Sequence, residues 1–205
     1  MARRGIPIVL SAPSGTGKTT LAHLLVNSIN DLFLSVSYTT RPMRGVEQDG
    51  ISYHFISENN FKLMIDRGEM LEWALVHGHY YGSSSAWTID MLNNGYDVLF
   101  DVDVQGGFQI KERFFDAVTI FITPPSFEEL ENRLIKRGTD PHDVIKYRLE
   151  SAVTEIEVGL QKYDYVINNE NLDRALFDLT SLIRTHHIMR IDRNKIRARL
   201  FLASI

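Results

Sequence analysis

The feature that most constrains this chain is a glycine-rich loop between an apolar run and a helical pattern. The loop Ala12–Thr19 reads Ala-Pro-Ser-Gly-Thr-Gly-Lys-Thr and follows the apolar run Ile6–Leu10. Successive backbone N–H groups at a helix N-terminus form a concave anion site, and glycine lets the backbone close around phosphate. With Ala12 in place of the first glycine, this is a P-loop pattern. In such a loop Lys18 reaches the β- and γ-phosphates of a nucleotide, and the Thr19 hydroxyl binds Mg²⁺.

Strand and helix patterns alternate along most of the chain. The predicted strands are near-continuously apolar: Ile6–Leu10, Phe33–Ser37, Asp97–Phe100, Val118–Ile122 and Tyr165–Ile167. The predicted helices lie between and after them: Lys18–Asn27, Gln105–Arg113, Ser126–Arg137, His142–Val158 and Leu172–Arg190. Strands that are apolar on both faces and joined by helices form a parallel sheet covered on both sides. The expected fold is therefore a three-layer α/β fold with a parallel five-stranded core sheet.

Residues 38–90 break this alternation. Short strand patterns with turn residues surround one helical pattern at Glu58–Arg67. We interpret the region as an inserted mixed α/β subdomain with short antiparallel strands.

Two carboxylates follow the apolar run Val98–Phe100, at the expected carboxyl end of a strand. They are Asp101 and Asp103. Ligands of open α/β sheets bind at this edge, and a carboxylate there can hold Mg²⁺ directly or through water. Asp103 could instead cap the helix predicted near Gln105.

Composition narrows the classes of protein further. The 205 residues include no cysteine, which excludes disulfides, thiolate nucleophiles and Cys-ligated metal sites. The net charge of −4 argues against a non-specific nucleic-acid binder, which needs a broad basic surface. No apolar stretch approaches the length of a membrane span, and the start of the chain lacks the apolar run of a signal peptide. We therefore expect a cytoplasmic protein without nucleic-acid or membrane partners.

Further motifs follow the P-loop in a fixed order. They are Ser35–Gly45, Glu72–Ala74, His79–Ser83 and Asp101–Gly106. Together these segments resemble the guanylate kinase family, and the resemblance runs from the P-loop to about Asp173. It implies transfer of the γ-phosphate of ATP to GMP, and also to dGMP, by in-line displacement with Mg²⁺. It also implies a role in purine nucleotide metabolism and GMP recycling.

The resemblance also implies roles for individual residues. ATP would be bound by Ala12, Pro13, Ser14, Gly15, Thr16, Gly17, Lys18, Thr19, Thr20 and Asn169. GMP would be bound by Ser37, Arg41, Arg44, Tyr53, Glu72, Tyr81, Gly82, Ser83 and Asp103. Thr19 and Asp101 would hold the metal, and catalysis would fall to Lys18, Arg133, Arg137 and Arg148. The single domain 1–205 would divide into a core of 1–37, 91–125 and 159–205, a GMP-binding subdomain of 38–90 and a lid region of 126–158.

The guanine-binding residues also make chemical sense by themselves. Guanine presents an acceptor at O6 and donors at N1 and N2. The Glu72 carboxylate accepts from both donors, whereas the hydroxyls of Ser37 and Ser83 can donate to O6. Adenine reverses this pattern, so it would leave a buried polar group unpaired.

The phosphate of GMP requires cationic donors. Arg41 and Arg44 lie on a loop with proline and glycine, and Tyr53 and Tyr81 lie nearby in the predicted subdomain. These four side chains can clamp a phosphate dianion by charge-assisted hydrogen bonds.

Three arginines occupy the predicted lid. Arg133 and Arg137 have i, i+4 spacing and share a helix face, and Arg148 lies on the next helix. By resemblance they converge on the transferring phosphoryl group when the lid closes. The alternative is a solvated helical hairpin.

Two other functions stay open at this point. One is a small-molecule kinase on the same scaffold that phosphorylates a ribose bisphosphate, which should lack Glu72 and the paired serines. The other is a non-catalytic interaction module, which the intact Lys18 and Thr19 disfavour. The basic stretch Arg184–Arg199 could bind RNA or anionic partners, although a solvated terminal helix fits it better. We expect a monomer or a weak homo-oligomer.

Overall fold

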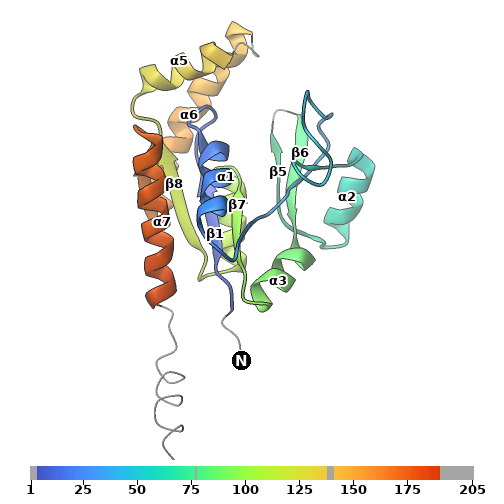
Figure 1. Ribbon diagram of the computed structural model, residues 1–205. Coiled ribbons are helices and arrows are strands. Elements are labelled where there is room, and N and C mark those ends of the chain that lie inside the picture. Colours follow the sequence, from blue (N-terminus) through green and yellow to red (C-terminus); the bar gives the residue numbers. More distant parts are fainter. Residues whose placement is uncertain (1–3, 77, 138–140, 190–205) are drawn as a thin grey trace, which may run out of the picture.

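The core of the molecule is a sheet of parallel strands (Figure 1). A computed structural model describes residues 4–76, 78–137 and 141–189 of the chain. The five strands of this sheet run in the order β2-β7-β1-β8-β9. Their bounds are Leu32–Leu34, Asp97–Asp101, Pro7–Ser11, Val118–Thr123 and Tyr165–Asn168. The expected three-layer α/β fold with five parallel core strands is confirmed.

Helices cover both faces of this sheet because successive strand residues point to opposite sides. Ile8 of β1 packs in a cluster with α1 (Lys18–Ser28) and α7 (Leu172–Met189). Its neighbour Val9 belongs to a second cluster on the other face. That face is covered by α3 (Ser85–Asn93), α4 (Val104–Arg113) and α6 (His142–Lys162).

One predicted strand was too long. The expected strand Phe33–Ser37 is β2 and ends at Leu34. The N–H of Ser35 still donates to the carbonyl of Leu99 at 2.8 Å, but the chain then leaves for the second sheet.

The second sheet lies beside the core (Figure 1) and has the order β4-β3-β6-β5. Its strands are Tyr38–Thr39 (β3), His54–Phe55 (β4), Met70–Val76 (β5) and His79–Ser84 (β6). The helix α2 (Glu58–Asp66) is capped by Ser57, whose hydroxyl accepts from the N–H of Asn60. The inserted mixed α/β unit is thus present, but the expectation of antiparallel strands was wrong for β3 and β4, which pair in parallel. The expected end of the subdomain at residue 90 falls inside the helix α3. The division of the chain into subdomains stays a prediction.

The strand β5 connects the second sheet to the core. Its pairing with β6 shifts between Met70 and Glu72, as in a β-bulge. Leu71 packs in the core cluster beneath this bulge. The backbone of Trp73 both donates to and accepts from the side-chain amide of Gln109 on α4, at 3.1 and 2.8 Å. β5 is therefore held to α4 by packing and by hydrogen bonds.

The helices α5 (Phe127–Arg137) and α6 form a hairpin-like pair at one end of the core sheet (Figure 1). Leu130 and Leu134 of α5 pack with Ile145 and Ala152 of α6. A Cβ on Gly15 of the P-loop would lie 3.0 Å from Leu134, so this pair packs directly on the loop. No described helix is both long and apolar enough to cross a membrane. Most of the basic stretch at the end of the chain lies outside the described residues.

Candidate active site

The P-loop forms a wall of an open cavity of about 350 Å³. Gly15 and Gly17 have φ of +92° and +97°, a conformation that glycine adopts without strain. No side chain caps the N-terminus of α1, so its first N–H groups remain available to an anion. The lining includes all the expected loop residues except Thr16, namely Ala12, Pro13, Ser14, Gly15, Gly17, Lys18, Thr19 and Thr20.

Two other predicted residues support the P-loop from behind. The buried Asn169 donates from Nδ2 to the carbonyl of Thr16 at 2.7 Å. Arg133 donates from Nη1 to the same carbonyl at 3.2 Å and from Nε to Glu129 at 2.8 Å. Neither side chain is part of the cavity lining, and each donates to the same P-loop carbonyl instead.

Lys18, Thr19 and Asp101 meet at the carboxyl end of β7. The Lys18 ammonium is ion-paired with Asp101 and donates to the carbonyl of Val102 at 2.8 Å. The Thr19 hydroxyl donates to Asp101 Oδ2 at 2.8 Å. A hydroxyl and a carboxylate side by side are ligands that Mg²⁺ accepts. The described residues contain no group of three or more His, Asp or Glu side chains arranged for a metal.

A second cavity of about 200 Å³ adjoins the first. Both are lined by Lys18, Thr19, Tyr53, Val76, Tyr81 and Asp103. The smaller one continues along Ser37, Glu72, Ala74, Asp101 and Val102. The two cavities therefore form one cleft with two compartments, and Lys18 lies where they meet.

Glu72 is a buried charged group in the lining of the smaller cavity. Only 3% of Glu72 is exposed, and burial raises the pKa of its carboxyl to about 7. The fully buried Ser83 donates to Glu72 Oε1 at 2.7 Å. Gly106 of α4 lets the carboxylate approach, because a Cβ there would lie 2.7 Å from Glu72 Oε2. A carboxylate so placed can accept hydrogen bonds from a ligand that carries paired N–H groups.

Ser83 and Gly82 lie differently from what the sequence suggested. Ser83 is not among the residues that line the cavity, and its hydroxyl is turned toward Glu72. Gly82 is buried against β5, where a Cβ would lie 2.7 Å from the Glu72 carbonyl. Ser83 thus positions the Glu72 carboxylate, and Gly82 allows the close approach of β5 and β6.

The capping interpretation of Asp103 is confirmed, whereas its role in ligand binding stays a prediction. Its side chain caps α4 by accepting from the N–H of Gly106 at 2.8 Å. It also lines both cavities. Its carbonyl accepts from the hydroxyl of Ser11 at 3.2 Å, and that hydroxyl accepts from Tyr163 at 2.8 Å.

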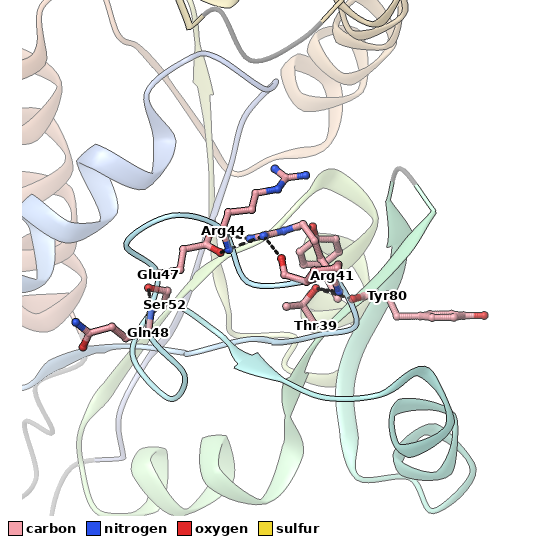
Figure 2. A network of polar contacts seen from close by, with 9 residues as sticks. Thr39, Arg41, Arg44, Glu47, Gln48, Ser52 and Tyr80 are labelled. Atoms are coloured by element: carbon pink, nitrogen blue, oxygen red, sulfur yellow. Dashed lines mark hydrogen bonds and ion pairs between the residues drawn. The ribbon is translucent and has the colours of Figure 1, made fainter.

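The predicted phosphate clamp forms a network around Arg41 (Figure 2). The Arg41 guanidinium lies over the ring of Tyr53 at 5.4 Å and donates from Nε to Tyr81 Oη at 3.2 Å. It also forms a two-pronged ion pair with Glu47 at 2.7 and 3.0 Å. Arg44 points away from this pair, and neither arginine lines the cavity directly. Tyr53 and Tyr81 do line it.

Sequence reasoning missed two carboxylates of this region. Glu47 was overlooked, although an acidic residue close to two arginines in one short loop is a signal for an ion pair. Glu155 of α6 lines the larger cavity beside Arg148, and burial raises its pKa to about 7. Arg148 itself donates to the Ser14 hydroxyl at 3.3 Å. Arg137 ends α5, and its side chain lies outside the described part of the chain.

Comparisons with known proteins agree with one another. The family model described as guanylate kinase matches residues 4–186. A guanylate kinase of Myxococcus xanthus is 48% identical over 179 residues, which cover 87% of this chain and 86% of that protein. One of Dechloromonas aromatica is 49% identical, with coverage of 86% and 87%. The crystal structure of guanylate kinase from Anaplasma phagocytophilum has a TM-score of 0.80 at 31% identity and covers 96% of this chain and 95% of that one.

Proposed function

Because the chain belongs to the guanylate kinase family and is an ATP:GMP phosphotransferase, we propose that its two adjoining cavities hold the two nucleotides. The phosphates of ATP would lie in the P-loop cavity, and GMP in the smaller one. The observation that carries this assignment is the buried Glu72 carboxylate in the lining of a cavity that also contains Lys18, which the P-loop cavity shares. The base of GMP would lie against Glu72, and its phosphate would lie toward the residues that line both cavities.

Glu72 would select guanine. Its carboxylate accepts from N1–H and N2–H of the base, and the bond from Ser83 fixes the plane of the carboxylate. Two donors from guanine stabilise the ionised form, so the pKa of Glu72 falls when GMP binds. Ser37 remains as a hydroxyl that lines the cavity and can donate to O6. Adenine would place an acceptor at N1 against the carboxylate, which is unfavourable.

The phosphoryl transfer would depend on positioning and charge. The acceptor is a GMP phosphate oxygen, which is mostly ionised at neutral pH because the second pKa of a phosphate monoester is about 6. No general base is therefore required. Lys18 lies where the two compartments meet, and Arg148 of the lid borders the P-loop cavity. In-line transfer between two phosphates held there is favoured by fixed cations in a site closed to water.

Thr19 and Asp101 would hold Mg²⁺ together with the phosphates of ATP, because their oxygens already lie side by side. The ion would neutralise charge on the β- and γ-phosphates. The proposal extends to dGMP, since the base and phosphate contacts described above involve no ribose hydroxyl. The GDP produced would feed purine nucleotide metabolism and the recycling of GMP. A cytoplasmic location and a monomeric or weakly associated state stay predictions.

A coupled assay with ATP and a panel of nucleoside monophosphates tests the base assignment. We expect the wild-type enzyme to prefer GMP and dGMP over AMP and UMP, and Glu72→Gln to lose most of kcat/KM for GMP. The matched control is Glu69→Gln, which removes an exposed carboxylate from the same subdomain. Equal turnover of AMP and GMP by the wild type, or full GMP activity in Glu72→Gln, would contradict the assignment.

A further inference from the structure

We propose that Glu47 is a positioning residue of the GMP phosphate site. Glu47 holds the Arg41 guanidinium in an orientation in which Arg41 and Tyr81 each direct a hydrogen-bond donor at the phosphate. The inference rests on the proposed placement of GMP in the smaller cavity. It adds a residue that neither the sequence motifs nor the cavity lining points to, because Glu47 acts through Arg41.

The geometry around Glu47 is that of a fixed anchor (Figure 2). Its Oε1 accepts from Arg41 Nη2 at 2.7 Å, and its Oε2 accepts from Arg41 Nη1 at 3.0 Å. The same Oε2 also accepts from the backbone N–H of Arg44 at 2.8 Å, and the Glu47 N–H donates to the Arg44 carbonyl at 3.0 Å. One carboxylate thus fixes both the Arg41 guanidinium and the loop that carries Arg44. Two parallel bonds to a planar guanidinium also set its orientation.

The hydrogen-bond count of Arg41 shows what remains for a ligand. Arg41 has five N–H groups. Nη1 uses two, toward Glu47 and the Pro42 carbonyl, Nη2 uses one toward Glu47, and Nε uses one toward Tyr81. Within the described residues, a single N–H on Nη2 is therefore left.

Tyr81 receives its orientation from the same arrangement. Its hydroxyl oxygen accepts from Arg41 Nε, so its own proton points elsewhere. Because Tyr81 lines both cavities, that proton is available to a phosphate between them. A chain of hydrogen bonds then runs from Glu47 through Arg41 and Tyr81 to the ligand, and such chains strengthen each member.

Charge explains why Arg41 needs this partner. Only 6% of Arg41 is exposed, and a buried guanidinium without a counter-charge is unfavourable. Glu47 raises the pKa of Arg41, and the ion pair lowers the pKa of Glu47, so the pair stays ionised at neutral pH. The alternative hypothesis is that Glu47 competes with the phosphate for Arg41 and must release it when GMP binds. The hydrogen bond from the Arg44 backbone to Glu47 disfavours this alternative, because release of Glu47 would also disrupt the loop.

Steady-state kinetics of Glu47→Gln and Glu47→Asp test the proposal. The matched control is Glu58→Gln, which removes an exposed i, i+4 ion pair with Lys62 on α2. The readouts are KM for GMP, KM for ATP, and inhibition by guanosine, which carries the base but no phosphate. We expect KM for GMP to rise about tenfold or more in Glu47→Gln and less in Glu47→Asp. KM for ATP and guanosine inhibition should stay within about twofold of the control.

Three outcomes would overturn the proposal. An unchanged KM for GMP in Glu47→Gln would show that Arg41 needs no anchor. A lower KM would show that Glu47 competes with the phosphate. A parallel loss of guanosine inhibition would show that Glu47 only maintains the subdomain. A wild-type enzyme with no GMP turnover would instead remove the proposed function itself, and with it this inference.

Discussion

Glu72→Gln should stabilise the nucleotide-free protein at alkaline pH while it abolishes guanine recognition. Burial raises the pKa of the Glu72 carboxyl from its ordinary 4.5 to about 7. When the pKa of a carboxyl is higher in the folded than in the unfolded protein, the protonated carboxyl stabilises the folded state. This stabilisation is complete at pH values below the unfolded pKa, and it is lost as the pH rises through the folded pKa. At about pH 8.5 the folded protein therefore carries an unfavourable buried charge that Gln does not have.

The magnitude follows from the size of that shift. At about 1.4 kcal/mol for each unit of pKa, the shift corresponds to roughly 3 kcal/mol. The hydrogen bond from Ser83 lowers the pKa of Glu72 and is already contained in this net shift. A gain of roughly 3 kcal/mol raises Tm by roughly 6–12 °C in a chain of this size.

The assay is thermal or urea unfolding of the nucleotide-free wild type, Glu72→Gln and the exposed control Glu69→Gln at about pH 5 and about pH 8.5. Glu72→Gln should exceed the wild type at the higher pH and lose this advantage at the lower one. An equal gain at both pH values, or no gain at the higher pH, would refute the reasoning that burial of an ionised Glu72 destabilises the free enzyme.

Further substitutions test the remaining contacts. Gly106→Ala places a Cβ 2.7 Å from Glu72 Oε2, so KM for GMP should rise about tenfold while KM for ATP stays constant; equal effects on both would contradict the contact. Lys18→Ala should mainly lower kcat, by about a hundredfold or more, and near-wild-type turnover would remove its assigned role. Asn169→Ala removes one of the two side-chain hydrogen bonds to the Thr16 carbonyl, so KM for ATP should rise with little change for GMP in the same kinetic assay. Ionised Glu155 adds negative charge beside the phosphates, so kcat/KM for ATP, measured at saturating GMP, should fall as the pH rises through about 7. Glu155→Gln should remove that decline, and an unchanged pH profile would exclude Glu155 as its source.

The core of the fold could be predicted because its signals are local. Runs such as Ile6–Leu10 and Val118–Ile122 are buried on both faces, and each is followed by a turn and a helix. The predicted extent of β2 was wrong because Val36 continues the apolar run of Phe33 and Leu34 while the chain already crosses to the second sheet. Strand propensity does not depend on the sheet with which a segment pairs, so it cannot indicate where the chain changes sheets.

The part of the site formed by strand ends and helix starts could be predicted from the sequence. The P-loop and Asp101 lie together as expected, because the end of a strand and the start of a helix determine their positions. The contacts of Ser83 with Glu72 and of Glu47 with Arg41 depend on side-chain orientation across strands and loops. A residue pattern contains the members of such pairs but not which atoms meet.

The attachment of β5 to α4 has a mechanical consequence. Through Leu71 and the Gln109 amide, the strand that carries Glu72 belongs to the same rigid frame as the P-loop. The loop with Arg41 lies on the far side of its sheet, next to β3 and β4. With GMP bound as we propose, closure of the subdomain would move the loop with Arg41 toward ATP while Glu72 and the purine stay with the core sheet, so that the base would be recognised before the phosphates are aligned for reaction.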